Sequence, residues 1–233
     1  HKIHLIGIGG SGMRAIANIL FQKGYEVSGS DVKESDVIER FRKMGATVHI
    51  GHNADYVQGV DAVVRSTAIR EDNPEIVAAK EQGITILHRS DIVKAVLDVT
   101  NGIAVAGAHG KTSTTSMIGQ ILVEGQMEPT VIIGGEVDYL KGSSCLGKGE
   151  YSVVEADESD GSFLKLRPKT IVITNIEDDH MDHYKTMENL LNAFCQFVET
   201  LPVDGKAVVC GDNDKSRYVM SKVERQFITY VLE

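Results

Sequence analysis

The chain has 233 residues, of which 42% are hydrophobic and 24% are charged, a composition typical of one or two soluble globular domains. Its formal net charge of −9 leaves no basic surplus to neutralise a phosphate backbone, so we expect no nucleic-acid partner. No apolar run approaches the roughly 20 residues that span a bilayer and no signal peptide is visible, so we expect no membrane association. Cys145, Cys195 and Cys210 are few and widely separated, which favours reduced thiols and a cytoplasmic protein.

The first candidate nucleotide site is a glycine-rich turn near the start of the chain. Residues 3–8 predict a buried strand, and an amphipathic helix follows the turn. A second predicted strand, residues 25–30, ends at Asp31 and completes the dinucleotide-binding fingerprint. We expect the turn to approach a pyrophosphate and Asp31 to accept from a ribose hydroxyl; a plain tight turn is the alternative. The candidate residues of the turn are Gly7, Gly9, Gly10, Ser11, Gly12 and Met13.

Strands and helices alternate through the rest of the first hundred residues. Strands are predicted at residues 46–50, 61–66 and 84–87, with helices between and after them. This alternation predicts an α/β fold with a Rossmann-like, doubly wound parallel sheet, whose ligands bind at the carboxyl ends of the strands. A linker-like stretch at residues 98–102 places a domain boundary near residue 100, giving domains 1–99 and 100–233.

A second glycine loop opens the second domain. The apolar run 102–106 predicts a buried strand, and residues 114–124 suit a helix. Strand, glycine turn, Lys-Thr and helix form the layout of a phosphate-binding loop, in which backbone N–H groups and a lysine face an anion. The full pattern requires glycine where this chain has Val105, so an ordinary strand–turn–helix is the alternative. The candidate residues are Gly107, Ala108, His109, Gly110, Lys111, Thr112 and Ser113.

Two later apolar strands end in acidic clusters. Residues 151–154 lead into Glu155-Ala156-Asp157-Glu158-Ser159-Asp160, and residues 170–174 lead into Asn175-Ile176-Glu177-Asp178-Asp179-His180-Met181-Asp182. Carboxylate oxygens suit Mg²⁺, so these strand ends, together with the Lys-Thr loop, predict a magnesium nucleotide site. Carboxylates that only solvate strand ends or cap helices are the alternative for each cluster. A transition-metal site built on His180 and His183 is a weaker interpretation.

In these motifs the sequence resembles the Mur ligase family, which adds amino acids to the peptidoglycan precursor. The resemblance rests on both glycine loops and both acidic strand ends, in one order along the chain, with Ser66-Thr67-Ala68-Ile69 and His88-Arg89 in the first domain. It implies a Rossmann-like UDP-sugar-binding domain followed by a P-loop-containing α/β ATP-binding domain. Family members have three domains, and the resemblance covers the first and part of the second.

The resemblance also implies a reaction and a set of roles. The γ-phosphoryl group of ATP moves to the lactyl carboxylate of UDP-N-acetylmuramic acid, and the amine of L-alanine attacks the resulting acyl phosphate. Lys111 and the loop amides are expected to hold the phosphates, while Thr112 and Glu155 bind one Mg²⁺ and His180 a second. Asn175 orients nearby groups. Gly7–Met13 grips the UDP pyrophosphate, with Asp31, Ser66 and Arg89 as further candidates for the nucleotide and sugar.

Other functions stay open on the sequence alone. An NAD-dependent oxidoreductase explains the first glycine turn but not the Lys-Thr loop or the acidic strand ends. A relative within the family that attaches a whole tripeptide during peptidoglycan recycling, and a non-catalytic nucleotide-binding fragment, are further alternatives. The sequence leaves open the amino acid added and the oligomeric state, and we expect the 233 residues by themselves to be inactive in ligation.

Overall fold

The computed structural model describes residues 1–231 and divides them into two compact α/β units. The first unit comprises His1–Ile92 together with Gly134–Leu146, and the second comprises Val93–Ile133 and the described residues from Gly147 onward. The prediction of an α/β fold with parallel sheets is confirmed. Within residues 1–231, no helix is long and apolar enough to cross a membrane.

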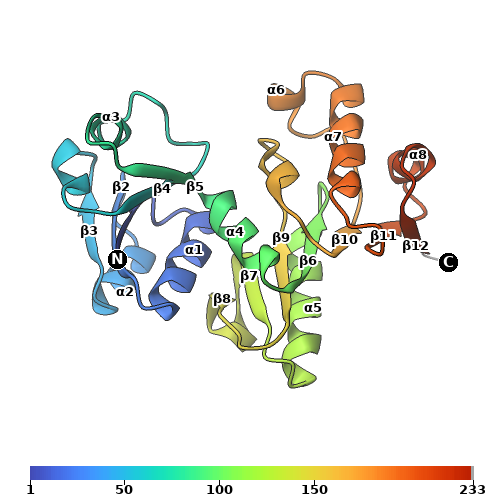
Figure 1. The fold of residues 1–233 in the computed structure, drawn as a ribbon, viewed down its shortest axis with the longest axis horizontal. Coiled ribbons are helices and arrows are strands. Elements are labelled where there is room, and N and C mark those ends of the chain that lie inside the picture. The colour runs from blue at the N-terminus through green and yellow to red at the C-terminus, as the bar shows by residue number, and fades with distance from the viewer. Residues whose placement is uncertain (232–233) are drawn as a thin grey trace. The chain divides into compact units, whose positions relative to one another are not determined.

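The first unit is built on a five-stranded sheet in the order β3-β2-β1-β4-β5, and every pair of neighbours is parallel (Figure 1). The strand order reverses at β1, and the crevice at such a reversal is the usual ligand site of doubly wound sheets. The first glycine turn begins directly where β1 ends. The elements are β1 (Lys2–Ile6), α1 (Ser11–Gln22), β2 (Glu26–Asp31), α2 (Asp36–Lys43), β3 (Thr47–Ile50), η1 (Ala54–Val57), β4 (Ala62–Arg65), α3 (Pro74–Glu81), β5 (Thr85–His88) and α4 (Arg89–Asp98).

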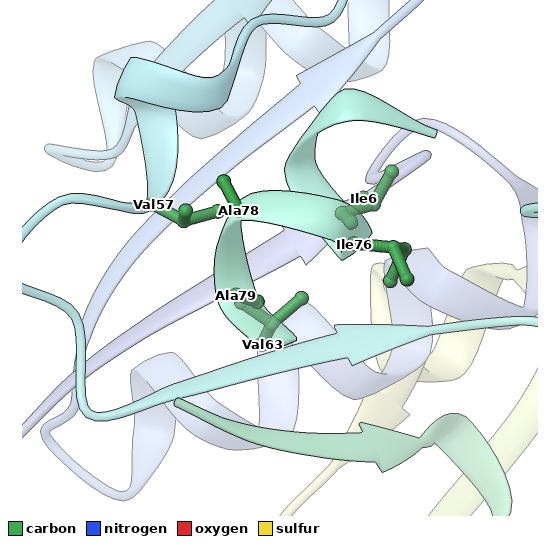
Figure 2. Close-up of a cluster of buried hydrophobic side chains, with 6 residues drawn as sticks. All are labelled: Ile6, Val57, Val63, Ile76, Ala78 and Ala79. Atoms are coloured by element: carbon green, nitrogen blue, oxygen red, sulfur yellow. The ribbon is translucent and has the colours of Figure 1, made fainter. Parts of the chain in front are cut away.

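An aliphatic cluster joins helix α3 to this sheet (Figure 2). Helix α3 starts cleanly because Pro74 occupies its first turn and the Asn73 side chain accepts from the Glu75 N–H. Burial of each large aliphatic side chain stabilises the fold by about 1.5–3 kcal/mol relative to exposure. The cluster consists of Ile6, Val57, Val63, Ile76, Ala78 and Ala79.

A polar network is buried beside that cluster. The Glu75 side chain is fully buried; its Oε2 lies 3.0 Å from His4 Nε2 and accepts from Ser30 Oγ at 2.7 Å. Its Oε1 lies 3.0 Å from His52 Nδ1. Burial by itself raises the pKa of Glu75, but the hydrogen bonds from His4, Ser30 and His52 outweigh it and hold the pKa below its ordinary value.

The second glycine loop follows the central strand of a seven-stranded sheet, ordered β12-β11-β10-β6-β9-β7-β8. Strand β6 lies between β10 and β9 in parallel register, with Ala106 opposite Ile173 and Val105 opposite Glu155. Helix α5 packs against β6 and β9. The elements are β6 (Asn101–Ala106), α5 (Lys111–Glu124), β7 (Thr130–Val137), η2 (Asp138–Leu140), β8 (Gly142–Cys145), β9 (Tyr151–Glu155), η3 (Ser162–Lys165), β10 (Thr170–Ile173), α6 (Met181–Tyr184), α7 (Met187–Glu199), β11 (Lys206–Cys210), α8 (Asp214–Lys222) and β12 (Gln226–Tyr230).

Strand β7 contributes to both units. It begins in the second unit, while its last residues and β8 belong to Gly134–Leu146 of the first. This segment packs on α1, where the buried Ser144 Oγ donates to the Ala15 carbonyl at 3.0 Å. The Leu146 N–H donates to Gln22 Oε1 at 2.7 Å. The first unit therefore includes a segment that lies beyond residue 100.

Candidate functional site

The second glycine loop has a backbone that requires glycine at two positions. Gly107 has a φ of 140°, and a side-chain carbon there would lie 2.0 Å from Thr174 Oγ1. Gly110 caps α5 in the left-handed region, with a φ of 83°. The first N–H groups of an α-helix have no partner within the helix, so the start of α5 offers donors and the positive end of its dipole to an anion.

The end of β10 holds this loop in place. The Asn175 backbone carbonyl accepts from the Ala108 N–H at 3.1 Å. Its side chain spans His109, since Oδ1 accepts from the His109 N–H and Nδ2 donates to the His109 carbonyl, both at 3.0 Å. Thr174 Oγ1 donates to the same carbonyl at 2.6 Å. The predicted site residue Asn175 thus lies at the loop and shapes it.

Lys111 lies between the loop and a buried carboxylate. Its Nζ donates to the Gly107 carbonyl at 2.5 Å and to Glu158 Oε1 at 2.9 Å. The Glu158 side chain is only 2% exposed, and the same oxygen lies 3.3 Å from His180 Nε2. Burial raises the pKa of Glu158 above its ordinary value, and the Lys111 charge opposes the rise without cancelling it. Lysine, carboxylate and imidazole therefore meet at one point beside the phosphate-binding loop.

Several polar atoms at the ends of β9 and β10, or in the loops that follow, are buried without a hydrogen-bond partner among the described residues. They include Glu158 Oε2, Glu155 Oε1 and His180 Nε2, the last being close to Glu158 but poorly aligned with it. Within residues 1–231 no three His, Cys, Asp or Glu side chains form a ready-made metal cluster. Protein sites for Mg²⁺ commonly supply one or two carboxylates and leave the remaining positions to water and phosphate oxygens. The orphaned carboxylate oxygens fit such an ion.

The first glycine turn is also closed by its own contacts. Gly7 has a φ of 76°, and its carbonyl accepts from the Gly10 N–H at 3.0 Å. Asp31 Oδ2 accepts from the Gly9 N–H at 2.9 Å. A side-chain carbon at Gly12 would lie 2.8 Å from Arg89 Nη1, so the Arg89 guanidinium lies against the first turn of α1. In this structure Asp31 therefore supports the turn directly.

The remaining predicted residues of the first unit lie at the same edge of the sheet. Ser66 follows β4, and Arg89 follows β5 as the first residue of α4. Ser11 is exposed at the start of α1, whereas the Met13 side chain is buried in the core, so only the Met13 backbone can face a ligand at the turn. The structure brings the glycine turn, Asp31, Ser66 and Arg89 to the carboxyl ends of parallel strands.

Sequence reasoning did not assign a site role to Glu158, Thr174 or Arg14. Glu158 lies three residues after the predicted ligand Glu155, in the same acidic stretch, and only its burial and its contact with Lys111 distinguish it. Arg14 Nε donates to the Gly9 carbonyl at 2.9 Å. Its position one turn into the helix was a usable signal, because helical side chains lean back toward the N-terminus.

The sequence matches two family profiles along almost its whole length. Residues 2–99 match the Mur ligase family, catalytic domain, and residues 105–233 match the Mur ligase middle domain. The chain belongs to the Mur ligase family. This confirms the resemblance inferred from the two glycine loops and the two acidic strand ends.

Similar sequences within the Mur ligase family point to one activity. The chain is 46% identical over 232 residues to UDP-N-acetylmuramate–L-alanine ligase of Desulfatibacillum aliphaticivorans, covering 100% of this chain and 51% of the relative. It is 48% identical over 231 residues to the protein of that name in Pelotomaculum thermopropionicum, covering 99% and 50%. The chain thus spans about half the length of the curated relatives it matches.

Two solved Mur ligase structures with different activities share the fold of this chain almost equally well. UDP-N-acetylmuramate-alanine ligase MurC from Thermotoga maritima superposes with a TM-score of 0.89 at 31% identity, over 100% of this chain and 53% of that one. UDP-N-acetylmuramate:L-alanyl-γ-D-glutamyl-meso-diaminopimelate ligase from Neisseria meningitidis superposes with a TM-score of 0.90 at 27% identity, over 98% and 77%. The backbone alone therefore does not choose between them.

Proposed function

We propose that this chain is part of a cytoplasmic, ATP-dependent ligase that joins L-alanine to the lactyl carboxylate of UDP-N-acetylmuramic acid in peptidoglycan precursor synthesis. The observation that carries the proposal is the convergence of Lys111, Glu158 and His180 beside a phosphate-binding loop, within a Mur ligase fold. The sequence relatives at 46% and 48% identity support L-alanine as the amino acid.

In this proposal the second unit handles ATP. The loop amides of residues 107–113 and the start of α5 bind the β- and γ-phosphates, and Lys111 adds a charge to them. Phosphoryl transfer requires positioning and charge neutralisation more than covalent help from the protein. A glycine loop that carries one lysine cation supplies both. Thr174 and Asn175 keep the loop in the binding conformation through His109.

The same site has the chemistry to hold magnesium. The family resemblance implies Thr112 and Glu155 as ligands of one Mg²⁺ and His180 as a ligand of a second. We add Glu158, because its buried carboxylate lies next to both Lys111 and His180. When bound, Mg²⁺ supplies positive charge that lowers the repulsion between the γ-phosphate and the acceptor carboxylate. The protein groups then serve to keep ATP and the acceptor in line.

The first unit holds the acceptor nucleotide. Gly7–Met13 approaches the UDP pyrophosphate, because glycines let the backbone come close to phosphate oxygens. Arg89 lies against the first turn of α1, and the Arg14 guanidinium donates to the Gly9 carbonyl. Two guanidinium groups therefore lie beside the glycine turn to which we assign the diphosphate. Asp31 and Ser66 are candidates for the uridine and sugar.

Phosphate release tests the proposed function. The full-length protein that carries this chain is mixed with ATP, Mg²⁺ and UDP-N-acetylmuramic acid, and phosphate release is measured with L-alanine, glycine or L-serine. We expect the fastest release with L-alanine and none without the UDP-sugar. The 233-residue chain assayed in parallel should bind the UDP-sugar and form no ligated product. Calorimetry that shows tighter binding of NAD⁺ than of UDP-N-acetylmuramic acid would contradict the ligase assignment.

A second candidate function is attachment of a whole tripeptide to the same UDP-sugar. It is favoured by the TM-score of 0.90 to the Neisseria meningitidis tripeptide-adding enzyme. The phosphate-release assay distinguishes the two when the tripeptide L-alanyl-γ-D-glutamyl-meso-diaminopimelate replaces L-alanine. A higher kcat/KM for the tripeptide would establish this second function.

A further inference from the structure

Tyr184 connects the two side chains that flank Lys111. It is the last residue of α6 and is buried, and its hydroxyl donates to the backbone carbonyl of Glu158. Its own N–H donates to the His180 carbonyl at 3.1 Å, across the single turn of α6. One residue is therefore bonded at its side chain to Glu158 and at its backbone to His180.

The turn that Tyr184 closes has a costly backbone. His180 has a φ of 58° at one end of α6, and Lys185 has a φ of 69° at the other. Non-glycine residues adopt such angles only where the surrounding contacts impose them. The contacts here include the Tyr184 hydroxyl on Glu158 and Asn189 Nδ2, which donates to the Tyr184 carbonyl at 2.7 Å. Together they fix where α6 places the His180 imidazole.

We propose that Tyr184 is a positioning residue that sets the separation between Glu158 and His180, and so prepares both for a magnesium-bound nucleotide phosphate. The inference rests on the proposed function of this site. Its geometric basis is the 3.3 Å between Glu158 Oε1 and His180 Nε2, which depends on α6 being tied to the acidic loop after β9. Tyr184 itself touches neither phosphate nor metal in this scheme.

The Tyr184 hydroxyl is suited to a permanent structural bond. Burial raises its pKa far above the ordinary value, and the charges of Glu158, Asp160 and Asp157 raise it further. In the structure the hydroxyl accordingly donates to the Glu158 carbonyl. His183 packs edge-on against its ring, with centroids 4.7 Å apart, which limits ring movement.

The test compares Tyr184→Phe with wild type in the full-length protein, using ATP binding by calorimetry across a Mg²⁺ titration. Phenylalanine keeps the ring and its packing and removes only the hydroxyl. We expect the half-saturating Mg²⁺ concentration to rise roughly 10-fold, the scale for losing a group that orients a metal ligand. ATP affinity without Mg²⁺ should stay within about twofold, since the variant leaves the loop amides untouched. Tyr56→Phe is the matched control, because Tyr56 stacks on His49 in the first unit.

Two results overturn the inference in distinguishable ways. If wild type responds to Mg²⁺ and Tyr184→Phe shows the same midpoint with only a lower melting temperature, Tyr184 is a packing residue and the proposed function stands. If wild type binds ATP equally well with and without Mg²⁺, the proposed metal role of the site fails and the inference fails with it.

Discussion

Two buried glutamates, one in each unit, differ in how completely their carboxylate oxygens are hydrogen-bonded and in the direction of their pKa shifts. Glu75 has partners on both oxygens, and its pKa is held below the ordinary value despite burial. Glu158 is equally buried, but one oxygen is shared by Lys111 and His180, the other has no partner among the described residues, and its pKa is raised. A buried carboxylate whose oxygens all have hydrogen-bond partners stabilises the fold. A buried carboxylate with an unsatisfied oxygen costs stability, but that oxygen can still bind a ligand.

The largest effect expected from this comparison is a loss of turnover on substitution of Lys111, the cationic partner of Glu158. In the full-length protein, Lys111→Ala should lower turnover by roughly 10²-fold or more, the scale for removing one group aimed at a developing anion. The melting temperature should also fall, because the variant leaves the buried Glu158 carboxylate without its cationic partner. Phosphate-release kinetics and thermal unfolding measure the two effects. Lys43→Ala, which removes an exposed ion pair with Glu39, is the control. Wild-type turnover in Lys111→Ala would show that the loop is only a structural turn.

The next largest effect separates Glu158 from Glu155. Glu158→Gln should weaken Mg²⁺-dependent ATP binding by about 10-fold or more, and Glu155→Gln should weaken it less, because only Glu158 lies against Lys111 and His180. Calorimetry of the two variants at matched Mg²⁺ concentrations decides the order. A larger loss in Glu155→Gln would restore Glu155 as the principal carboxylate of the site.

We also expect Glu158→Gln not to destabilise the fold at pH 7. A carboxyl whose folded pKa lies above its ordinary 4.5 binds its proton more tightly in the folded state, so its contribution to stability is present below pH 4.5 and is lost as the pH rises through the folded pKa. The glutamine variant lacks this loss. Its melting temperature at pH 7 should therefore equal or exceed that of wild type.

Glu75→Gln should behave in the opposite way. Both Glu75 oxygens have hydrogen-bond partners, so removing the charge should lower the free energy of unfolding by about 1–3 kcal/mol at pH 7. The folded pKa of Glu75 lies below 4.5, so the stabilisation is complete above pH 4.5 and is lost as the pH falls through the folded pKa. Denaturant unfolding at pH 7 and at pH 4 measures the difference between variant and wild type, which should shrink at the lower pH. A constant difference would show that the substitution disturbs packing and not charge.

The smallest effect is expected at the first glycine turn. Asp31→Ala removes the acceptor of the Gly9 N–H and should weaken binding of UDP-N-acetylmuramic acid about fivefold, near 1 kcal/mol. Calorimetry with the 233-residue chain measures it. Uridine should lose no affinity in the variant if Asp31 acts only through the turn, and a parallel loss for uridine would restore the predicted ribose contact.

The sequence was most informative where function depends on neighbouring residues along the chain. Gly107 and Gly110 adopt backbone angles that glycine favours, and both follow an apolar strand, so the loop could be predicted from a few consecutive letters. Glu155 and Glu158 could not be ranked in this way, because their difference arises from the path of the chain after β9 and from distant partners. Lys111, for example, is 47 positions from Glu158, and only the folded structure brings the two together.

Long-range packing also explains why residues 134–146 belong to the first compact unit. Nothing in the local pattern of residues 134–146 marks them as part of the first unit. Their place there depends on contacts such as Ser144 with Ala15, which are 129 positions apart in the sequence. Apolar periodicity identifies elements but does not identify their partners.

The division of strand β7 between the units has a consequence for how the protein is made. A nascent chain emerges from the ribosome N-terminal end first, and contiguous domains can fold in that order. The first unit is not contiguous, because α1 packs against β8, which is synthesised after β6, α5 and the whole of β7. Folding of the first unit therefore cannot finish until synthesis has passed Leu146, when the second glycine loop has already been synthesised. The first unit can therefore be completed only after part of the second unit has been synthesised, and a ribosome stalled near residue 100 would hold an incomplete first unit.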